Sequence, residues 1–186
     1  MATGQWRNIE IAPPRTFTCG HCGIVVGQDR GYVFQGPPSR LIYPCPSCDQ
    51  PTFFEGAKQV PGVAYGNTVE HLPSDIASLY AEARNCLSVA APTASVLACR
   101  KLLMNVAVSQ GADEGKNFTE YVTYLSDKGY VPPNASGWVD HIRKKGNEAT
   151  HKIPQVSQAD AQDLITFLEM ILKLVFEFPN RVPKTP

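Results

Sequence analysis

Neither sign of charge is in excess in this sequence, because 17 Lys and Arg residues balance 17 Asp and Glu residues. Proteins that coat nucleic acid with their whole surface carry a clear basic excess, which attracts the polyanion. The balance excludes that class, so any contact with nucleic acid has to be local. It also favours an adaptor that binds another protein.

The sequence has no uninterrupted apolar segment long enough to cross a bilayer. The most apolar run, ITFLEMILKLVFEF at residues 165–178, is interrupted by Glu169, Lys173 and Glu177. The first residues, MATGQWRNIEIAPPRTF, contain no apolar segment behind a basic start, so we expect no secretory signal peptide. The sequence therefore predicts a cytoplasmic protein, in a reducing compartment, with no membrane contact.

Familiar catalytic patterns are also absent. There is no Gly-x-Ser-x-Gly, no HExxH and no paired-carboxylate nuclease pattern. The stretch GADEGKN at 111–117 has neither the spacing nor the Ser or Thr after Lys of a phosphate-binding loop. These absences exclude the common serine hydrolases, zinc proteases and P-loop nucleotidases.

Composition changes near residue 56. Before this point Cys, Gly and Pro alternate with short β-prone runs, and after about residue 73 the pattern is helical. A chain of 186 residues with 43% hydrophobic content has room for one ordinary domain and a small accessory one. We therefore expect a small β-rich domain at residues 10–56, a linker at 57–72 and a helical domain at 73–180.

The strongest local pattern consists of cysteines. Cys19-Gly-His-Cys22 is followed, after 22 residues, by Cys45-Pro-Ser-Cys48. Two such CxxC pairs supply four thiolates for a tetrahedral zinc site, and a reducing compartment favours metal over disulfides. Four thiolates leave no open position for water, so we predict one structural zinc ion in a zinc ribbon.

Aromatic residues are frequent in the same region: Tyr32, Phe34, Tyr43, Phe53 and Phe54. Such rings can stack on nucleic-acid bases, or they can form the small core of the ribbon itself. Zinc ribbons contact nucleic acid or other proteins, and the sequence leaves both roles open.

Helical periodicity dominates the second part, in stretches that begin at Ser74, Pro92, Asn117, about Ala135 and Ser157. Asn117 and Ser157 are typical N-cap residues. The last stretch is so apolar that it belongs either in the centre of a bundle or at a subunit interface. The sequence thus predicts a mainly α fold, a bundle of about five helices preceded by the small β-rich ribbon.

The stretch IRKKGNEATH at residues 142–151 carries a polar row. Arg143, Asn147 and His151 are four residues apart, so on a helix they form a slanting line. A neutral imidazole can take the proton of a ribose 2′-hydroxyl while a guanidinium holds the phosphate. The row is therefore a candidate site for metal-independent RNA cleavage.

Three lysines near the row, Lys144, Lys145 and Lys152, are candidate nucleic-acid contacts. The row also has a structural interpretation. Gly146 suggests the close approach of another helix, and His151 near a helix end would interact favourably with the last carbonyl groups. Cleavage, binding without cleavage and a structural role all stay open.

From about Leu72 to Pro179 the segments LPSDIASLYAEARNCL, ASVLACRKLLMNVA and IRKKGNEATH resemble an uncharacterised family of bacterial and phage helical domains. That family is grouped with the HEPN superfamily, and its members often carry a zinc ribbon in front. The most specific part is Arg-x-x-Gly-Asn-x-Ala-x-His, here residues 143–151. The resemblance implies a HEPN-like bundle, a homodimer that pairs two copies of the row, and a ribonuclease of bacterial defence or a phage counterpart.

The resemblance assigns the catalytic His to His151. Arg143 leaves seven intervening residues, outside the usual range of the superfamily, whereas Lys145 leaves five but lacks the bidentate phosphate grip of arginine. Our hypothesis is a zinc-ribbon protein that recognises nucleic acid, RNA in preference to DNA. The alternative is a non-catalytic adaptor, in which the ribbon binds a partner protein and the bundle dimerises.

Overall fold

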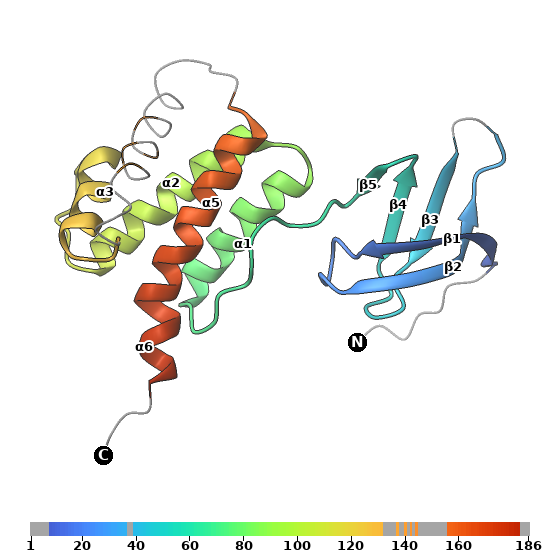
Figure 1. Ribbon diagram of the computed structural model, residues 1–186, viewed down its shortest axis with the longest axis horizontal. Helices are drawn as coiled ribbons and strands as arrows, with labels where there is room; N and C mark the ends of the chain where they lie inside the picture. The colour runs from blue at the N-terminus through green and yellow to red at the C-terminus, as the bar shows by residue number, and fades with distance from the viewer. Residues whose placement is uncertain are drawn as a thin grey trace. The chain divides into compact units, whose positions relative to one another are not determined.

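The computed structural model describes residues 8–36, 39–131 and 156–182, together with the single positions 137, 140, 142 and 144. The chain divides into two compact units, Met1–Ala64 and Tyr65–Pro186. The first is built on a sheet and the second on helices (Figure 1). Each unit has its own hydrophobic core, with no residue in common, so each is described by itself.

Five antiparallel strands form the first unit, in the spatial order β1-β2-β3-β4-β5. Their bounds are β1 Glu10–Thr18, β2 Val25–Val33, β3 Arg40–Pro44, β4 Pro51–Glu55 and β5 Lys58–Val60. Strands that follow each other in the chain are also neighbours in the sheet. The strand β2 is shared, because its part up to Gly31 pairs with β1 while Tyr32 and Val33 pair with β3.

Aromatic rings fill the core of the sheet unit. Phe17, Tyr43 and Phe54 are at most 7% exposed, and their ring centroids lie 5.1 to 6.1 Å apart in tilted and edge-to-face arrangements that stabilise aromatic clusters. Gly31 lies where the backbone of β3 comes close. A Cβ atom at this position would be 2.3 Å from the carbonyl oxygen of Ile42, so only glycine fits.

In the ranges 65–131 and 156–182 that the structure describes, the second unit contains four helices. They are α1 Ser74–Ser88, α2 Pro92–Ser109, α3 Phe118–Asp127 and α5 Gln158–Leu172, and α5 continues through a π-helical turn, η2 Lys173–Glu177, into α6 Phe178–Arg181. The helix α2 packs against α1, α3 and α5 (Figure 1). Capping boxes at Asn117 and Ser157 confirm both predicted helix starts.

The last helix lies in the core of its unit. The buried side chains of α5 include Leu164, Phe167, Leu168 and Ile171, and Ile142 from the preceding stretch joins the same cluster. Of the two placements that the apolar sequence left open, the centre of a bundle or a subunit interface, these side chains show the first. Among the helices that the structure describes, none is long and apolar enough to cross a membrane.

The prediction of a mainly α fold with a bundle of about five helices is wrong. Of the described residues 46% are helical and 20% lie in strands, in a five-stranded sheet and four helices when α5, η2 and α6 are counted as one. The sheet was underestimated because β1 runs through Pro13 and Pro14, where the pairing register shifts. Prolines of this kind are tolerated on an edge strand, but they hide the strand in the sequence.

Two further differences concern the stretches between the expected elements. The short strand β5 lies in the segment 57–72, for which the sequence predicts a linker. The helix expected from about residue 135 lies mostly outside the described residues, although positions 137, 140, 142 and 144 are helical.

Polar contacts fix the segment 65–70 to the helices of the second unit. Arg84 donates two hydrogen bonds to carbonyl groups of this segment, and the Tyr80 hydroxyl donates one. The Glu169 carboxylate accepts the backbone N–H of Asn67 at 2.8 Å and the side-chain amide of the same residue at 2.9 Å. The helical unit therefore begins with a well-anchored segment.

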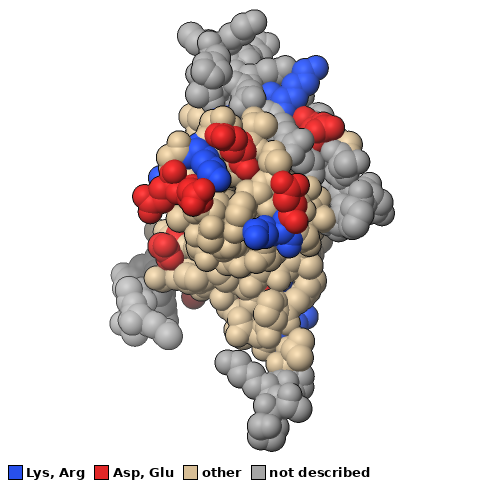
Figure 2. Space-filling model, turned by 90° about the vertical axis from the view of Figure 1, so that its left-hand side faces the viewer, with Lys and Arg blue, Asp and Glu red and all other residues tan. Residues whose placement is uncertain are grey.

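Charges of both signs are mixed on the side of the molecule that Figure 2 presents. Lys and Arg side chains lie there among Asp and Glu side chains, rather than in a patch of one sign. This agrees with the zero net charge of the sequence. The described part of this face therefore offers no extended basic surface.

Candidate metal centre

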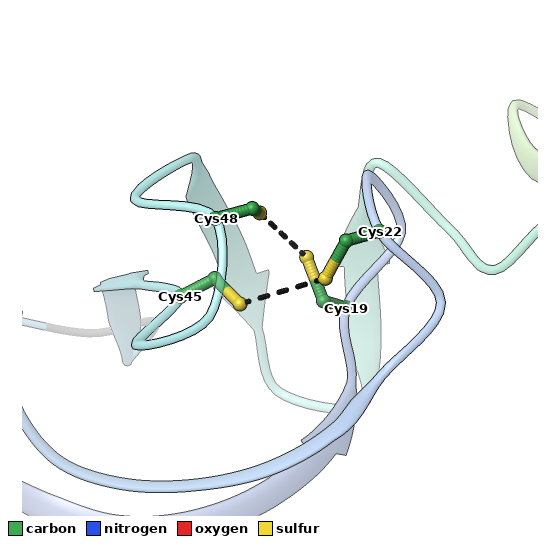
Figure 3. Close-up of side chains that lie close together, drawn as sticks. All are labelled: Cys19, Cys22, Cys45 and Cys48. Atoms are coloured by element: carbon green, nitrogen blue, oxygen red, sulfur yellow. Dashed lines mark hydrogen bonds between the residues drawn. The ribbon is translucent and has the colours of Figure 1, made fainter.

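Two loops of the sheet unit bring the four predicted cysteine ligands together. Cys19 and Cys22 follow β1, while Cys45 and Cys48 follow β3, and all four Sγ atoms lie within 4.8 Å of one another. Figure 3 shows the four side chains converging on one space from these two loops. The structure thus joins two segments that are more than 20 residues apart in the sequence.

The spacing of the sulfur atoms fits a tetrahedral metal ion. The Cys19–Cys48 and Cys22–Cys45 Sγ distances are both 3.8 Å. Zinc–sulfur bonds of about 2.3 Å in a regular tetrahedron place the sulfurs about 3.8 Å apart. The four thiols can therefore hold one metal ion without a large rearrangement.

The two loops have the same backbone geometry. In the first, the N–H of Gly23 donates to the carbonyl oxygen of Cys19, and in the second the N–H of Asp49 donates to that of Cys45. Gly23 and Asp49 occupy equivalent positions and both have a positive φ, +74° and +58°. This left-handed conformation turns the chain back so that both cysteines of a pair face the same point.

Backbone N–H groups also point at the sulfurs. The N–H of His21 lies 3.4 Å from Cys19 Sγ, and the N–H of Ser47 lies 3.4 Å from Cys45 Sγ. Although burial raises the pKa of the Cys19 thiol, the N–H groups of Cys22 and His21 lower it to about 7. Such donors stabilise thiolates, the form that binds metal.

Cys48 differs from Cys19, because burial raises the pKa of its thiol to about 12. The Cys19 and Cys48 thiols therefore do not ionise together without a cation. A bound divalent ion reverses this, because its charge deprotonates coordinating thiols outright.

Packing behind the first loop explains two residues that the sequence analysis missed. A Cβ atom on Gly20 would lie 2.4 Å from the carbonyl oxygen of Pro61, so glycine allows the loop to approach the segment after β5. The side-chain amide of Gln59 donates to the carbonyl oxygens of Thr18 and Pro61 and joins the same two segments. The sequence predicted only the cysteine ligands from their spacing, because the contacts of Gly20 and Gln59 are made with residues distant in the chain.

His21 connects the two loops. Its imidazole Nε2 lies 3.1 Å from the carbonyl oxygen of Pro51, which follows the second cysteine pair at the start of β4. The residue is exposed and lies outside the four-sulfur group.

The aromatic residues of the ribbon divide between the two faces of the sheet. Tyr43 and Phe54 are buried in the core, whereas Tyr32 and Phe53 are partly exposed and Phe34 is 49% exposed. The core role therefore applies to Tyr43 and Phe54, while stacking on bases stays a prediction for the other three rings. We call the sheet face opposite the core the outer face. It carries Tyr32, Phe34, Arg40, Ile42, Phe53, Glu55, Lys58 and Val60.

The candidate RNA-cleaving row is not placed by the structure. Arg143, Asn147 and His151 lie outside the described residues, and so do the candidate contacts Lys145 and Lys152. Lys144 is described, at an exposed helical position. The roles of these residues stay predictions.

The remaining cysteines do not join the metal centre. Cys86 on α1 is half-buried and Cys99 on α2 is fully buried, and burial raises the pKa of the Cys99 thiol to about 12. Within the described ranges the four-cysteine group is the only cluster of His, Cys, Asp or Glu side chains with metal-binding geometry.

Comparison with known proteins concerns the helical unit. A family model described as "Domain of unknown function (DUF4145)" matches residues 81–185, more than half of the chain. The sheet and its four cysteines lie outside this match. No curated protein and no solved structure matches the chain.

Proposed function

The chain belongs to the DUF4145 family, and we propose that it recognises nucleic acid, RNA in preference to DNA, with a sheet unit stabilised by one structural zinc ion. The observation that carries the zinc part of the proposal is the closed set of four converging sulfurs. Four thiolates complete a tetrahedron and leave no position for water or substrate. The metal therefore serves the fold, and function belongs to the surfaces that it stabilises.

Zinc is the metal we propose, because four thiolates in a tetrahedron suit zinc or an iron site and zinc needs no redox partner. Elemental analysis of the purified chain tests this. We expect about one zinc per chain, loss of the metal in Cys45→Ser, and unchanged zinc content in Cys86→Ser, which alters a cysteine outside the group. Iron, or zinc in all three proteins alike, would contradict the assignment. A thiolate zinc site of this kind also fits the cytoplasmic location that we propose.

Recognition of nucleic acid is supported by the cationic side chains that lie over aromatic rings in the sheet unit. The Arg40 guanidinium is 5.2 Å from the centre of the Phe34 ring, and the Arg15 guanidinium is 4.3 Å from that of Phe54. Guanidinium groups bind phosphate and stack on planar groups, and both properties are used in RNA binding.

Binding is tested with the full zinc-loaded chain and a fluorescent RNA of mixed sequence, titrated at several salt concentrations. We expect an affinity that falls as salt rises, because each phosphate contact releases counterions. Absence of binding at low salt would refute recognition of RNA.

Cleavage is a separate hypothesis, based on the resemblance of residues 143–151 to HEPN ribonucleases. His151 is the proposed base and Arg143 or Lys145 the phosphate-binding cation, with Asn147 orienting the RNA. RNA is incubated in EDTA with the wild type and with His151→Ala. Faster loss of RNA with the wild type supports cleavage. Equal rates of RNA loss with the two proteins would exclude cleavage by His151 and would leave the proposed recognition of RNA unaffected.

The adaptor function is favoured by the zero net charge of the chain. It predicts no RNA binding and a protein partner at the sheet unit.

We also propose that the chain forms a homodimer through its last helix. A stripe of Thr166, Met170, Leu174 and Phe178 lines an open hollow of about 700 Å³ there.

A further inference from the structure

The outer face of the sheet carries a row of apolar side chains that the core does not use. Tyr32 pairs with Ile42, Ile42 with Phe53, and Phe53 with Val60, so the row runs across β2, β3, β4 and β5. Directly paired residues place their side chains on the same face. Core residues such as Leu41 and Phe54 pair with each other in the adjacent register and point to the opposite face.

The four-strand row is partly open to solvent. Ile42 and Phe53 are only partly buried, and Val60 at its end is 41% exposed. Strands lie about 4.8 Å apart, so the row spans roughly 14 Å. That length accommodates two or three bases, as on sheets that stack single-stranded RNA.

A second row beside the first carries the charges. Arg40 pairs with Glu55 and Glu55 with Lys58, and the Arg40 guanidinium bonds the Glu55 carboxylate at 2.8 Å. Phe34 extends this row, because its N–H donates to the carbonyl oxygen of Arg40 and the guanidinium lies over its ring. Arg40 and Lys58 thus stand beside the apolar row with one carboxylate, which is bonded to Arg40, so the second row carries a net charge of one positive.

We infer that the outer face is the binding surface for a single-stranded nucleic acid, with its bases on Phe34 and Phe53 and its phosphates toward Arg40 and Lys58. This inference rests on the proposed function and names both its surface and its substrate class. Bases of a single strand expose their planar faces, whereas those of a duplex are stacked inside it. The combination of open rings with a cationic edge therefore suits a single strand.

The distribution of charge favours a polyanion over a protein partner. The outer face has a surplus of positive charge, although the described part of the sheet unit has four basic and four acidic residues in all. A ring beneath a guanidinium offers a platform for a base on one side and a phosphate contact at its edge. A peptide strand would instead use the sheet edges, where β1 is interrupted by Pro13 and Pro14.

The experiment measures fluorescence anisotropy of the full zinc-loaded chain with a 12-nucleotide oligouridylate, its deoxy counterpart and a 12-base-pair RNA duplex. The variants are Phe34→Leu, Phe34→Tyr and Lys58→Ala, with Val25→Ala as control. Val25 is 67% exposed on β2 and lies outside the outer face. Zinc content and melting temperature check that every variant is folded.

We expect the single strands to bind more tightly than the duplex. Phe34→Leu keeps apolar area but loses stacking, so its affinity should fall by about tenfold. Phe34→Tyr keeps a ring and should recover most of that loss, and Val25→Ala should bind like the wild type. Lys58→Ala should make the plot of log affinity against log salt concentration less steep, by the contribution of about one phosphate contact. A preference of the wild type for RNA over DNA would identify the natural single strand.

The outcomes separate this inference from the proposed function. If the wild type binds none of the probes, both fail. If it binds but prefers the duplex, or if Phe34→Leu and Val25→Ala bind equally well, the outer face is not the surface and recognition of nucleic acid stands.

Discussion

At the scale of single residues, Glu169 connects the segment 65–70 to the last helix of the helical unit. Its side chain is 12% exposed and holds the Asn67 backbone on one side and the Lys173 ammonium on the other. Burial raises the pKa of Glu169, but the hydrogen bonds from Asn67 and Lys173 outweigh it, and the pKa lies below the usual 4.5. The folded state therefore favours the ionised carboxylate.

The pH dependence of stability follows from this sign. A group with a lowered pKa in the folded state stabilises the fold above its unfolded pKa, and the contribution is lost as the pH falls through the folded pKa. We expect Glu169→Gln to lower the unfolding free energy by about 2 kcal/mol at pH 7. The difference from wild type should shrink as the pH falls below the ordinary carboxyl pKa of 4.5.

Urea unfolding followed by the helical circular dichroism signal measures this effect. Glu82→Gln, on an exposed position of α1, is the control and should change little at any pH. A Glu169→Gln effect that is constant from pH 7 to pH 3 would show that the carboxylate charge is unimportant.

At the scale of the element, the strand β2 shows how a single glycine decides the packing of a sheet. A Cβ atom on Gly31 would collide with the Ile42 carbonyl oxygen of β3, whereas a Cβ atom on Gly27 would have nothing within 4 Å. Both glycines belong to the same strand, and neither has a positive φ. They form a matched pair that differs only in the room available for a Cβ atom.

We expect Gly31→Ala to destabilise the sheet unit by about 1 to 3 kcal/mol, because β2 and β3 have to separate. Gly27→Ala should be neutral or slightly stabilising, since alanine restricts the unfolded chain. The chelator concentration that releases half of the metal is the readout, because metal binding and folding of a small metal domain are linked. Equal midpoints for the two variants would contradict the close approach at Gly31.

At the scale of the whole molecule, the two units have separate cores, and only the sheet unit contains the metal ligands. A small sheet buries too little apolar surface to be stable without its ion. We expect an excess of chelator to remove protection from amide exchange in β2, β3 and β4, while α1, α2 and α5 keep theirs. Hydrogen exchange with mass spectrometry resolves these segments.

The metal-free variant Cys45→Ser serves as the control for chelation. Its sheet amides should already exchange quickly, and adding chelator should change nothing further. Simultaneous loss of protection in the helices would mean that the two units fold as one.

Dimerisation is the second prediction for the whole molecule. Phe178 is 46% exposed at the end of the stripe on the last helix, beside the open hollow. We expect a mass of twice 20.3 kDa by light scattering, and a monomer for Phe178→Asp. Val89→Asp changes a still more exposed apolar residue, at 64%, away from the stripe and should stay dimeric. A wild-type monomer would exclude the homodimer.

The sequence alone identified the features that depend on a few neighbouring residues. The CxxC pairs indicated the metal ligands, and Asn117 and Ser157 indicated helix starts, because a loop or a cap is formed by residues within a few positions of each other. The apolar composition of the last helix also indicated that it could lie in the centre of its unit.

Tertiary structure decided what depends on residues far apart in the chain. Cross-strand register decides which face of the sheet Phe53 and Phe54 occupy, and it includes Pro13 and Pro14 in a strand. Close backbone approach decides that glycine is needed at positions 20 and 31. A shift of one residue in register exchanges the two faces of a strand, and local sequence does not specify that register in short strands. For this reason the metal ligands could be predicted from the sequence, whereas the outer face became visible only when the strands were paired.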